Sequence, residues 1–194
     1  MELAAPLIGQ EMSLQDFRDW DQGDLGGAKY EWRDGELEEK PGGWMKPEEL
    51  RIVLNLEDWF HQTEAFKQGH RLISETSFHL EAIKATRIPD MAYLTLQQLC
   101  QAEEGLGKAL VPLWVIEIIS PSDRVFDIED KTQEYFDSGV QLVWQIFPRH
   151  KRVGVLRSSI QDVSLLTVDA ICSAAPVLPE FEIRVCDVFK SRKG

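Results

Sequence analysis

Two acidic residues and one lysine stand out in this 194-residue sequence, because each occurs in apolar surroundings. Glu117 interrupts the apolar segment 111–119, Asp90 follows a proline in the segment 88–94, and Lys131 borders the apolar stripe of a predicted helix. Two carboxylates can hold Mg²⁺, which prefers oxygen ligands and keeps several of its waters. A nearby lysine can orient the attacking water and stabilise developing negative charge. If the three residues converge, they predict metal-assisted phosphodiester hydrolysis.

Each of these residues also has an ordinary structural explanation. Glu117 can pair with a lysine or arginine at the rim of a sheet, which offsets the cost of burying its charge. Asp90 can be a solvated turn residue, and Lys131 can pack its stem while its ammonium stays in water. A fourth candidate, Glu49, falls on the apolar face of a predicted helix, but at the third helical position it can simply satisfy free N–H groups.

The elements that must position these residues are those of an α/β domain with one mixed sheet. Asp34-Gly35 between alternating segments predicts a two-residue hairpin over about 29–39. Helices are expected over about 47–67, which begins at a proline, and over about 124–138, which ends before Gly139. The apolar segment 112–119 is typical of a strand covered on both faces. Further strands are expected at about 72–80, 88–94, 141–147 and 152–157, with weaker signals at 163–168 and 181–186.

Composition limits the function classes. The chain has 21 basic and 33 acidic residues, a formal net charge of −12, which argues against binding nucleic acid by bulk electrostatics alone. It has no apolar run of membrane-spanning length, and its three cysteines form no CxxC pair that would suggest zinc or a disulfide framework. We therefore expect a cytoplasmic protein. The compact basic segment Arg149–Arg152 is either a solvated hairpin tip or a phosphate contact.

Several short segments, in this order along the chain, give the sequence a family resemblance. It resembles the Uma2 family of putative restriction endonucleases, part of the PD-(D/E)XK nuclease superfamily. The resemblance spans nearly the whole chain and implies a restriction-endonuclease-like core over 44–194, preceded by a helix and hairpin extension over 1–43, in one domain. The segments that carry it are Tyr30–Leu37, Arg87–Asp90, Val115–Ser122, Lys131 with Tyr135, Gly139-Val140 with Trp144, and Leu178–Glu182.

The resemblance assigns roles to residues already singled out. Asp90 and Glu117 would be the metal-binding acids, with Mg²⁺ or Mn²⁺ as the cofactor and DNA as the substrate. The usual superfamily lysine lies two residues after the second acid, where this chain has Ile119, so the resemblance maps the lysine onto Lys131 of the following helix.

Three further residues belong to the expected site: Glu49 joins Asp90, Glu117 and Lys131 as a catalytic candidate, and Glu36 and Tyr135 are secondary candidates. Glu49 stands where relatives often have a histidine, so it either supplies an extra acid or marks a site that has drifted. Glu36 is another family acid, whose ordinary explanation is a cross-strand pair with Arg33, and Tyr135 accompanies the lysine.

Two other functions remain open from the sequence. A non-catalytic binding or regulatory module on a nuclease fold would fit the net charge of −12. A metal-dependent hydrolase acting on a different phosphate or small substrate would use the same residues. A homodimer is a further hypothesis, since endonucleases that cut both strands often pair two active sites.

Overall fold

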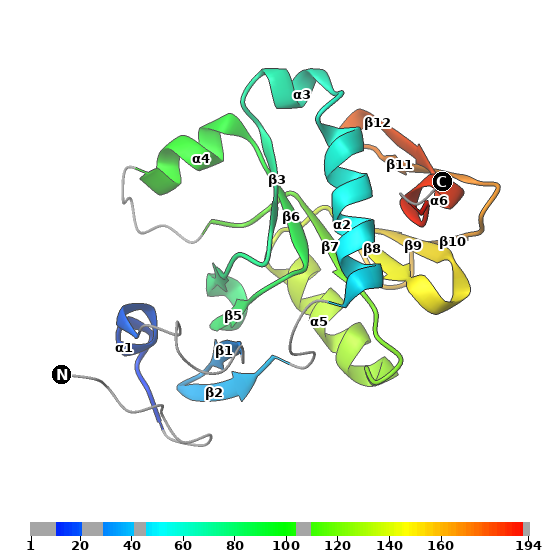
Figure 1. Ribbon diagram of the computed structural model, residues 1–194. Coiled ribbons are helices and arrows are strands. Elements are labelled where there is room, and N and C mark those ends of the chain that lie inside the picture. The colour runs from blue at the N-terminus through cyan, green and yellow to red at the C-terminus, as the bar shows by residue number, and fades with distance from the viewer. Residues whose placement is uncertain (1–10, 21–28, 41–45, 104–109, 192–194) are drawn as a thin grey trace.

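The computed structural model describes residues 11–20, 29–40, 46–103 and 110–191, and a six-stranded mixed sheet organises most of them (Figure 1). The strand order is β10-β9-β8-β7-β6-β3, with β7 and β8 parallel and the other pairs antiparallel. The strands are β3 (Arg71–Ser74), β6 (Met91–Leu94), β7 (Trp114–Ile118), β8 (Leu142–Phe147), β9 (Arg152–Arg157) and β10 (Val163–Leu166). The predicted mixed α/β class is confirmed.

Helices cover both faces of the central strand β7, which explains its apolar sequence. Trp114, Ile116 and Ile118 belong to the core beneath α2 (Pro47–Phe60). Val115 belongs to a second core together with Tyr135 of α5 (Val125–Asp137). Because side chains alternate along a strand, Glu117 points to the α5 side of the sheet.

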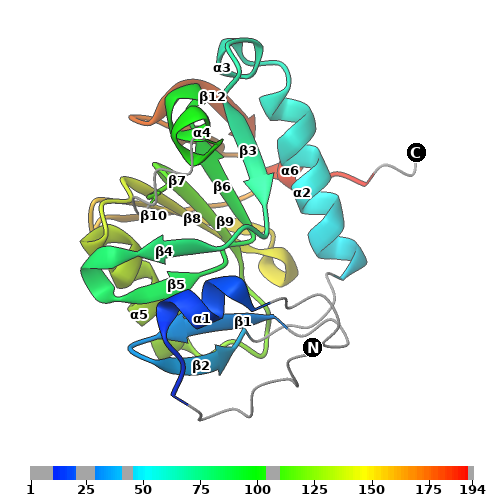
Figure 2. The same ribbon diagram turned by 90° about the vertical axis from the view of Figure 1, so that its left-hand side faces the viewer.

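A four-stranded sheet of order β2-β1-β5-β4 adjoins the large sheet (Figure 2). The predicted hairpin is present as β1 (Tyr30–Arg33) and β2 (Glu36–Glu39), and both turn residues have positive φ, 46° at Asp34 and 97° at Gly35. Its apolar face and α1 (Leu14–Asp19) form a small separate core. The boundary predicted near residue 43 lies outside the described residues.

Two predicted strands are each interrupted, because the chain passes from one sheet to the other. The strand expected at 72–80 divides into β3 and β4 (Phe78–Leu80), with Glu75 at φ 49° between them. The strand expected at 88–94 begins only at residue 91, and β5 (Ala85–Arg87) precedes it. Asp90 lies in this second crossing, immediately after Pro89, which has no N–H to donate to a ladder.

Other boundaries also differ from the prediction. The first long helix ends at Phe60, where the Thr63 hydroxyl donates to the Phe60 carbonyl and caps the separate short helix α3 (Glu64–Lys67). Elements that the sequence did not predict are α4 (Leu96–Glu103), β11 (Ile171–Ala174), α6 (Val185–Val188) and the 3₁₀ turns η1 (Glu81–Ile83) and η2 (Pro148–His150). The last strand, β12 (Leu178–Arg184), begins three residues earlier than expected and pairs with β11.

Aromatic rings fill the centre of the larger core. Trp114 lies 4.8 Å from Trp144 and 5.1 Å from Phe181, measured between ring centroids, and none of the three is exposed. This packing joins β7, β8 and β12. Across the described segments, we find no helix that combines the length and apolarity needed to cross a bilayer.

Candidate active site

Asp90 and Glu117 come together because of the strand register. Met91 of β6 pairs with Ile116 of β7 in an antiparallel ladder. Asp90, which precedes Met91, therefore lies opposite Glu117, which follows Ile116. The two carboxylates therefore meet at one end of the large sheet, where both line a single cavity.

The Asp90 carboxylate is held from two sides. Its Oδ2 accepts a hydrogen bond of 2.6 Å from the backbone N–H of Ile118, and its Oδ1 lies 3.1 Å from the Lys40 ammonium. The backbone contact comes from the strand that carries Glu117, so it couples the positions of the two acids. The aspartate is thus an oriented group and not a freely solvated turn residue.

The Glu117 carboxylate has two partners on α5. Its Oε1 accepts 2.5 Å from the Tyr135 hydroxyl and lies 3.1 Å from the Lys131 ammonium. Burial raises the pKa of Glu117, although the positive charge of Lys131 opposes that shift. The rim pairing expected for a buried glutamate is therefore present, and the pairing group is the lysine that the resemblance assigns to the site.

The Lys131 side chain reaches across from its helix to the acids. Besides Glu117, its ammonium lies 3.6 Å from Glu31 Oε1 on the hairpin. Burial alone would lower the pKa of Lys131, but the carboxylates of Glu117, Glu31 and Asp90 outweigh it and raise that pKa above its usual value. The Lys131 side chain is 22% exposed and lines the cavity.

The two other predicted acids lie in different surroundings. Glu49 lines the cavity from the start of α2, where its carboxylate accepts 2.8 Å from the Lys46 N–H and lies 3.4 Å from the Lys46 ammonium. Glu49 therefore has the helix-capping role that its position near the start of α2 predicted. Glu36 is exposed and does not line the cavity. The ion pairs of Arg33 go to Glu38 and to α5, not to Glu36.

The cavity has a volume of about 590 Å³, and most of its described lining residues are charged. Its described lining contains ten acidic and seven basic residues, so carboxylates are in excess. Paired carboxylates are hard oxygen donors of the kind that Mg²⁺ or Mn²⁺ prefers. No cluster of three or more metal-ligating side chains occurs in the described ranges, so an ion here would depend on Asp90, Glu117 and water. The donor set fits a hard divalent cation.

Three residues around the site were missed by the sequence reasoning: Glu31, Lys40 and Arg87. One signal was available, because the two-residue turn places Glu31 directly opposite Glu38 in the hairpin. Like charges opposite each other are destabilising, which predicts a cation between them. That cation is Arg87, which is 2% exposed and lies 3.0 Å from Glu31 and 3.5 Å from Glu38.

The sequence and the fold together define the class of protein. The model of the Uma2 family, described as a putative restriction endonuclease, matches residues 14–186, and the chain belongs to this family. The fold is similar to that of a putative nuclease belonging to DUF820 from Anabaena variabilis, with a TM-score of 0.73 at 18% identity over 92% of this chain and 97% of that one. No curated protein matches the chain. Family membership confirms the predicted resemblance and supports a nuclease function in general.

Proposed function

We propose that the protein is a divalent-cation-dependent endonuclease of the PD-(D/E)XK type that hydrolyses DNA phosphodiester bonds. One observation carries the proposal: Asp90 and Glu117, from separate segments of the chain, meet at one cavity with the Lys131 ammonium 3.1 Å from Glu117. Membership of the Uma2 family supports the reaction class.

Asp90 and Glu117 would hold Mg²⁺ or Mn²⁺. When bound, such an ion lowers the pKa of water and neutralises charge on a phosphate. Lys131 would donate a hydrogen bond to the attacking water and stabilise the negative charge that develops on the phosphate. The Tyr135 hydroxyl and the Ile118 N–H orient the two carboxylates through the hydrogen bonds described above. Glu49 would support the site only after releasing its contacts to Lys46.

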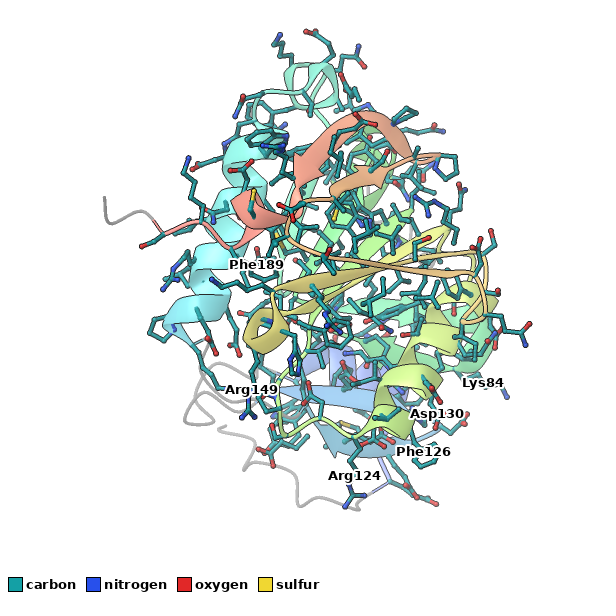
Figure 3. All side chains as sticks on the ribbon, turned by 90° about the vertical axis from the view of Figure 1, so that its right-hand side faces the viewer. Lys84, Arg124, Phe126, Asp130, Arg149 and Phe189 are labelled. Atoms are coloured by element: carbon teal, nitrogen blue, oxygen red, sulfur yellow. The ribbon has the colours of Figure 1, made fainter. Side chains whose placement is uncertain are left out.

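A basic segment at the same end of the sheet supports a nucleic-acid substrate. Because β8 runs parallel to β7, with Gln145 opposite Glu117, the chain beyond β8 emerges beside the acids. That segment is the exposed tip Arg149–Arg152, whose first residue is labelled in Figure 3. Lysine and arginine side chains there would contact phosphates on either side of the cut bond.

The decisive experiment incubates supercoiled plasmid DNA with the protein and Mn²⁺ or Mg²⁺. Nicking or linearisation is expected with the wild-type chain and loss of it with Asp90→Ala and with Glu117→Ala. Asp137→Ala, which removes an exposed acid from the same helix as Lys131, is the matched control and should cut normally. Cleavage that persists in both site variants would contradict the proposal.

The excess of carboxylates in the cavity favours a second candidate, a non-catalytic binding module on the same fold. In that case Lys40 and Lys131 would neutralise the acids permanently. Isothermal titration calorimetry separates the two, because the nuclease must bind Mn²⁺ and the binding module need not. A homodimer that pairs two sites stays a prediction, which sedimentation analysis would test.

A further inference from the structure

We propose that Glu31 of the hairpin is a positioning residue for this site, holding both Lys131 and the turn that carries Asp90. The inference rests on the proposed function and deepens it, because it assigns part of the site's geometry to a segment far from the acids in the sequence. Glu31 lies on β1, 59 residues before Asp90 and 100 residues before Lys131.

The first contact of Glu31 fixes the Asp90 turn. Its Oε1 accepts a hydrogen bond of 2.8 Å from the backbone N–H of Ile88. Ile88 is separated from Asp90 only by Pro89, whose ring fixes φ and leaves the segment few ways to move. Since the Asp90 carboxylate is in turn bound to the Ile118 N–H, the turn is held at both of its ends.

The second contact reaches the lysine. The same oxygen, Oε1, lies 3.6 Å from the Lys131 ammonium, which Glu117 approaches at 3.1 Å. The ammonium is thus held between two carboxylates, one on the hairpin and one on β7. Glu31 therefore limits how far Lys131 can move away from Glu117.

Stability alone gives a weak reason for an acid at this position. Glu31 is 6% exposed and faces the like charge of Glu38 across the hairpin. A buried ion pair such as Glu31 with Arg87 is often replaceable as a whole by apolar groups without loss of stability, and Arg87 has a second partner in Glu134. The contacts to Ile88 and Lys131 supply the reason that an apolar side chain could not.

Glu134 provides a matched control, because it belongs to the same ion-pair network without contacting the site. It lies 2.8 Å from Arg87 and 2.7 Å from Arg33. In the described part of the chain, its ion pairs go to these two arginines and not to Lys131, and the Ile88 N–H donates to Glu31 instead. Removing Glu134 therefore takes an equal charge from the network and leaves both positioning contacts in place.

The experiment compares Glu31→Ala, Glu31→Gln and Glu134→Ala in the full-length chain by three measurements: Tm, Mn²⁺ affinity by calorimetry, and kcat and KM for plasmid cleavage. Groups that orient metal ligands typically contribute 10–100-fold, so Glu31→Ala should weaken Mn²⁺ binding and lower kcat by about that factor. The KM for DNA should stay nearly constant, because the contacts of Glu31 go to Arg87, Ile88 and Lys131 and not to the proposed phosphate contacts at Arg149–Arg152. Glu31→Gln retains an oxygen for the Ile88 N–H, so it should lose less affinity, and it keeps the test valid if the alanine variant does not fold.

The outcomes separate the inference from the proposed function. Equal losses of Mn²⁺ affinity in the Glu31 and Glu134 variants, or a lowered Tm with unchanged affinity, would overturn the role of Glu31 even if the wild-type chain cuts DNA. If the wild-type chain binds Mn²⁺ but does not cut DNA, the nuclease proposal fails, and the comparison of Mn²⁺ affinities still decides whether Glu31 positions the site. If it binds no Mn²⁺, both are overturned.

Discussion

Replacing Lys40 with methionine should make the cavity bind a divalent cation more tightly. The Lys40 ammonium lies 3.1 Å from Asp90 Oδ1, and the two side chains are only 12% and 20% exposed. A cation that binds Asp90 must therefore displace this ammonium or tolerate its repulsion. Methionine keeps most of the packing volume and removes the charge. The Asp90 carboxylate stays oriented, because the Ile118 N–H still binds its other oxygen.

The size of the effect follows from the geometry. At an effective dielectric constant of about 20, two unit charges 3.1 Å apart attract by roughly 5 kcal/mol. Loss of hydration offsets most of this attraction, and a hydrogen bond to a charged group is worth about 1.5–3 kcal/mol net. Since about 1.4 kcal/mol is a tenfold change in Kd, Lys40→Met should bind Mn²⁺ at least about tenfold more tightly.

The assay is a calorimetric titration of each variant with Mn²⁺, and Lys29→Met is the control. Lys29 also lines the cavity, but its ion pair goes to Glu75 and not to either proposed ligand. Its replacement should change the affinity much less. Unchanged or weaker Mn²⁺ binding in Lys40→Met, or an equal gain in both variants, would refute the reasoning.

Three further predictions test the site and the core. Tyr135→Phe keeps the buried ring and removes the hydroxyl that donates to Glu117, so it should lower the cleavage rate several-fold with little change in Tm. That loss corresponds to about 1 kcal/mol of transition-state stabilisation, and wild-type activity would contradict the orienting role. Trp144→Ala should lower the free energy of unfolding, measured by urea titration, by about 3–5 kcal/mol, because the ring is fully buried against two other aromatic rings. A loss below about 1 kcal/mol would show that neighbouring side chains fill the space. Burial raises the pKa of the Cys172 thiol to about 12, so at pH 8 this thiol should stay protonated and resist a thiol reagent until urea unfolds the chain. The other two cysteines are exposed and should react at once, so three fast-reacting thiols in the folded protein would contradict the prediction.

The parts of the fold that the sequence predicted depend on local chemistry. Asp34-Gly35 determines its hairpin because only a few residue types accept positive φ at both turn positions. The apolar run around Glu117 predicted a doubly covered strand, and the single charge within it indicated the candidate site. These signals need no knowledge of distant residues.

The parts that were missed depend on contacts between distant segments. The interruptions at Glu75 and Pro89 arise because two sheets share one pair of bent strands, which strand propensity alone does not reveal. Glu31 and Arg87 are recognisable as site residues only through their contact, which joins positions 56 residues apart in the chain. Lys40 has no distinctive sequence context, and only its distance from Asp90 identifies it.

The attachment of the hairpin to the rest of the chain has a consequence for truncated or degenerating relatives. Through the Trp32 N–H, which donates 2.6 Å to the Thr86 hydroxyl, β1 is fastened to β5 just ahead of the Asp90 turn. A shortened chain starting at residue 46 would keep both proposed ligands and Lys131 but would lose Glu31 and Lys40. Such a relative would still encode the residues by which the proposed site is recognised, and yet it would lack the side chains that hold Asp90 and Lys131 in place.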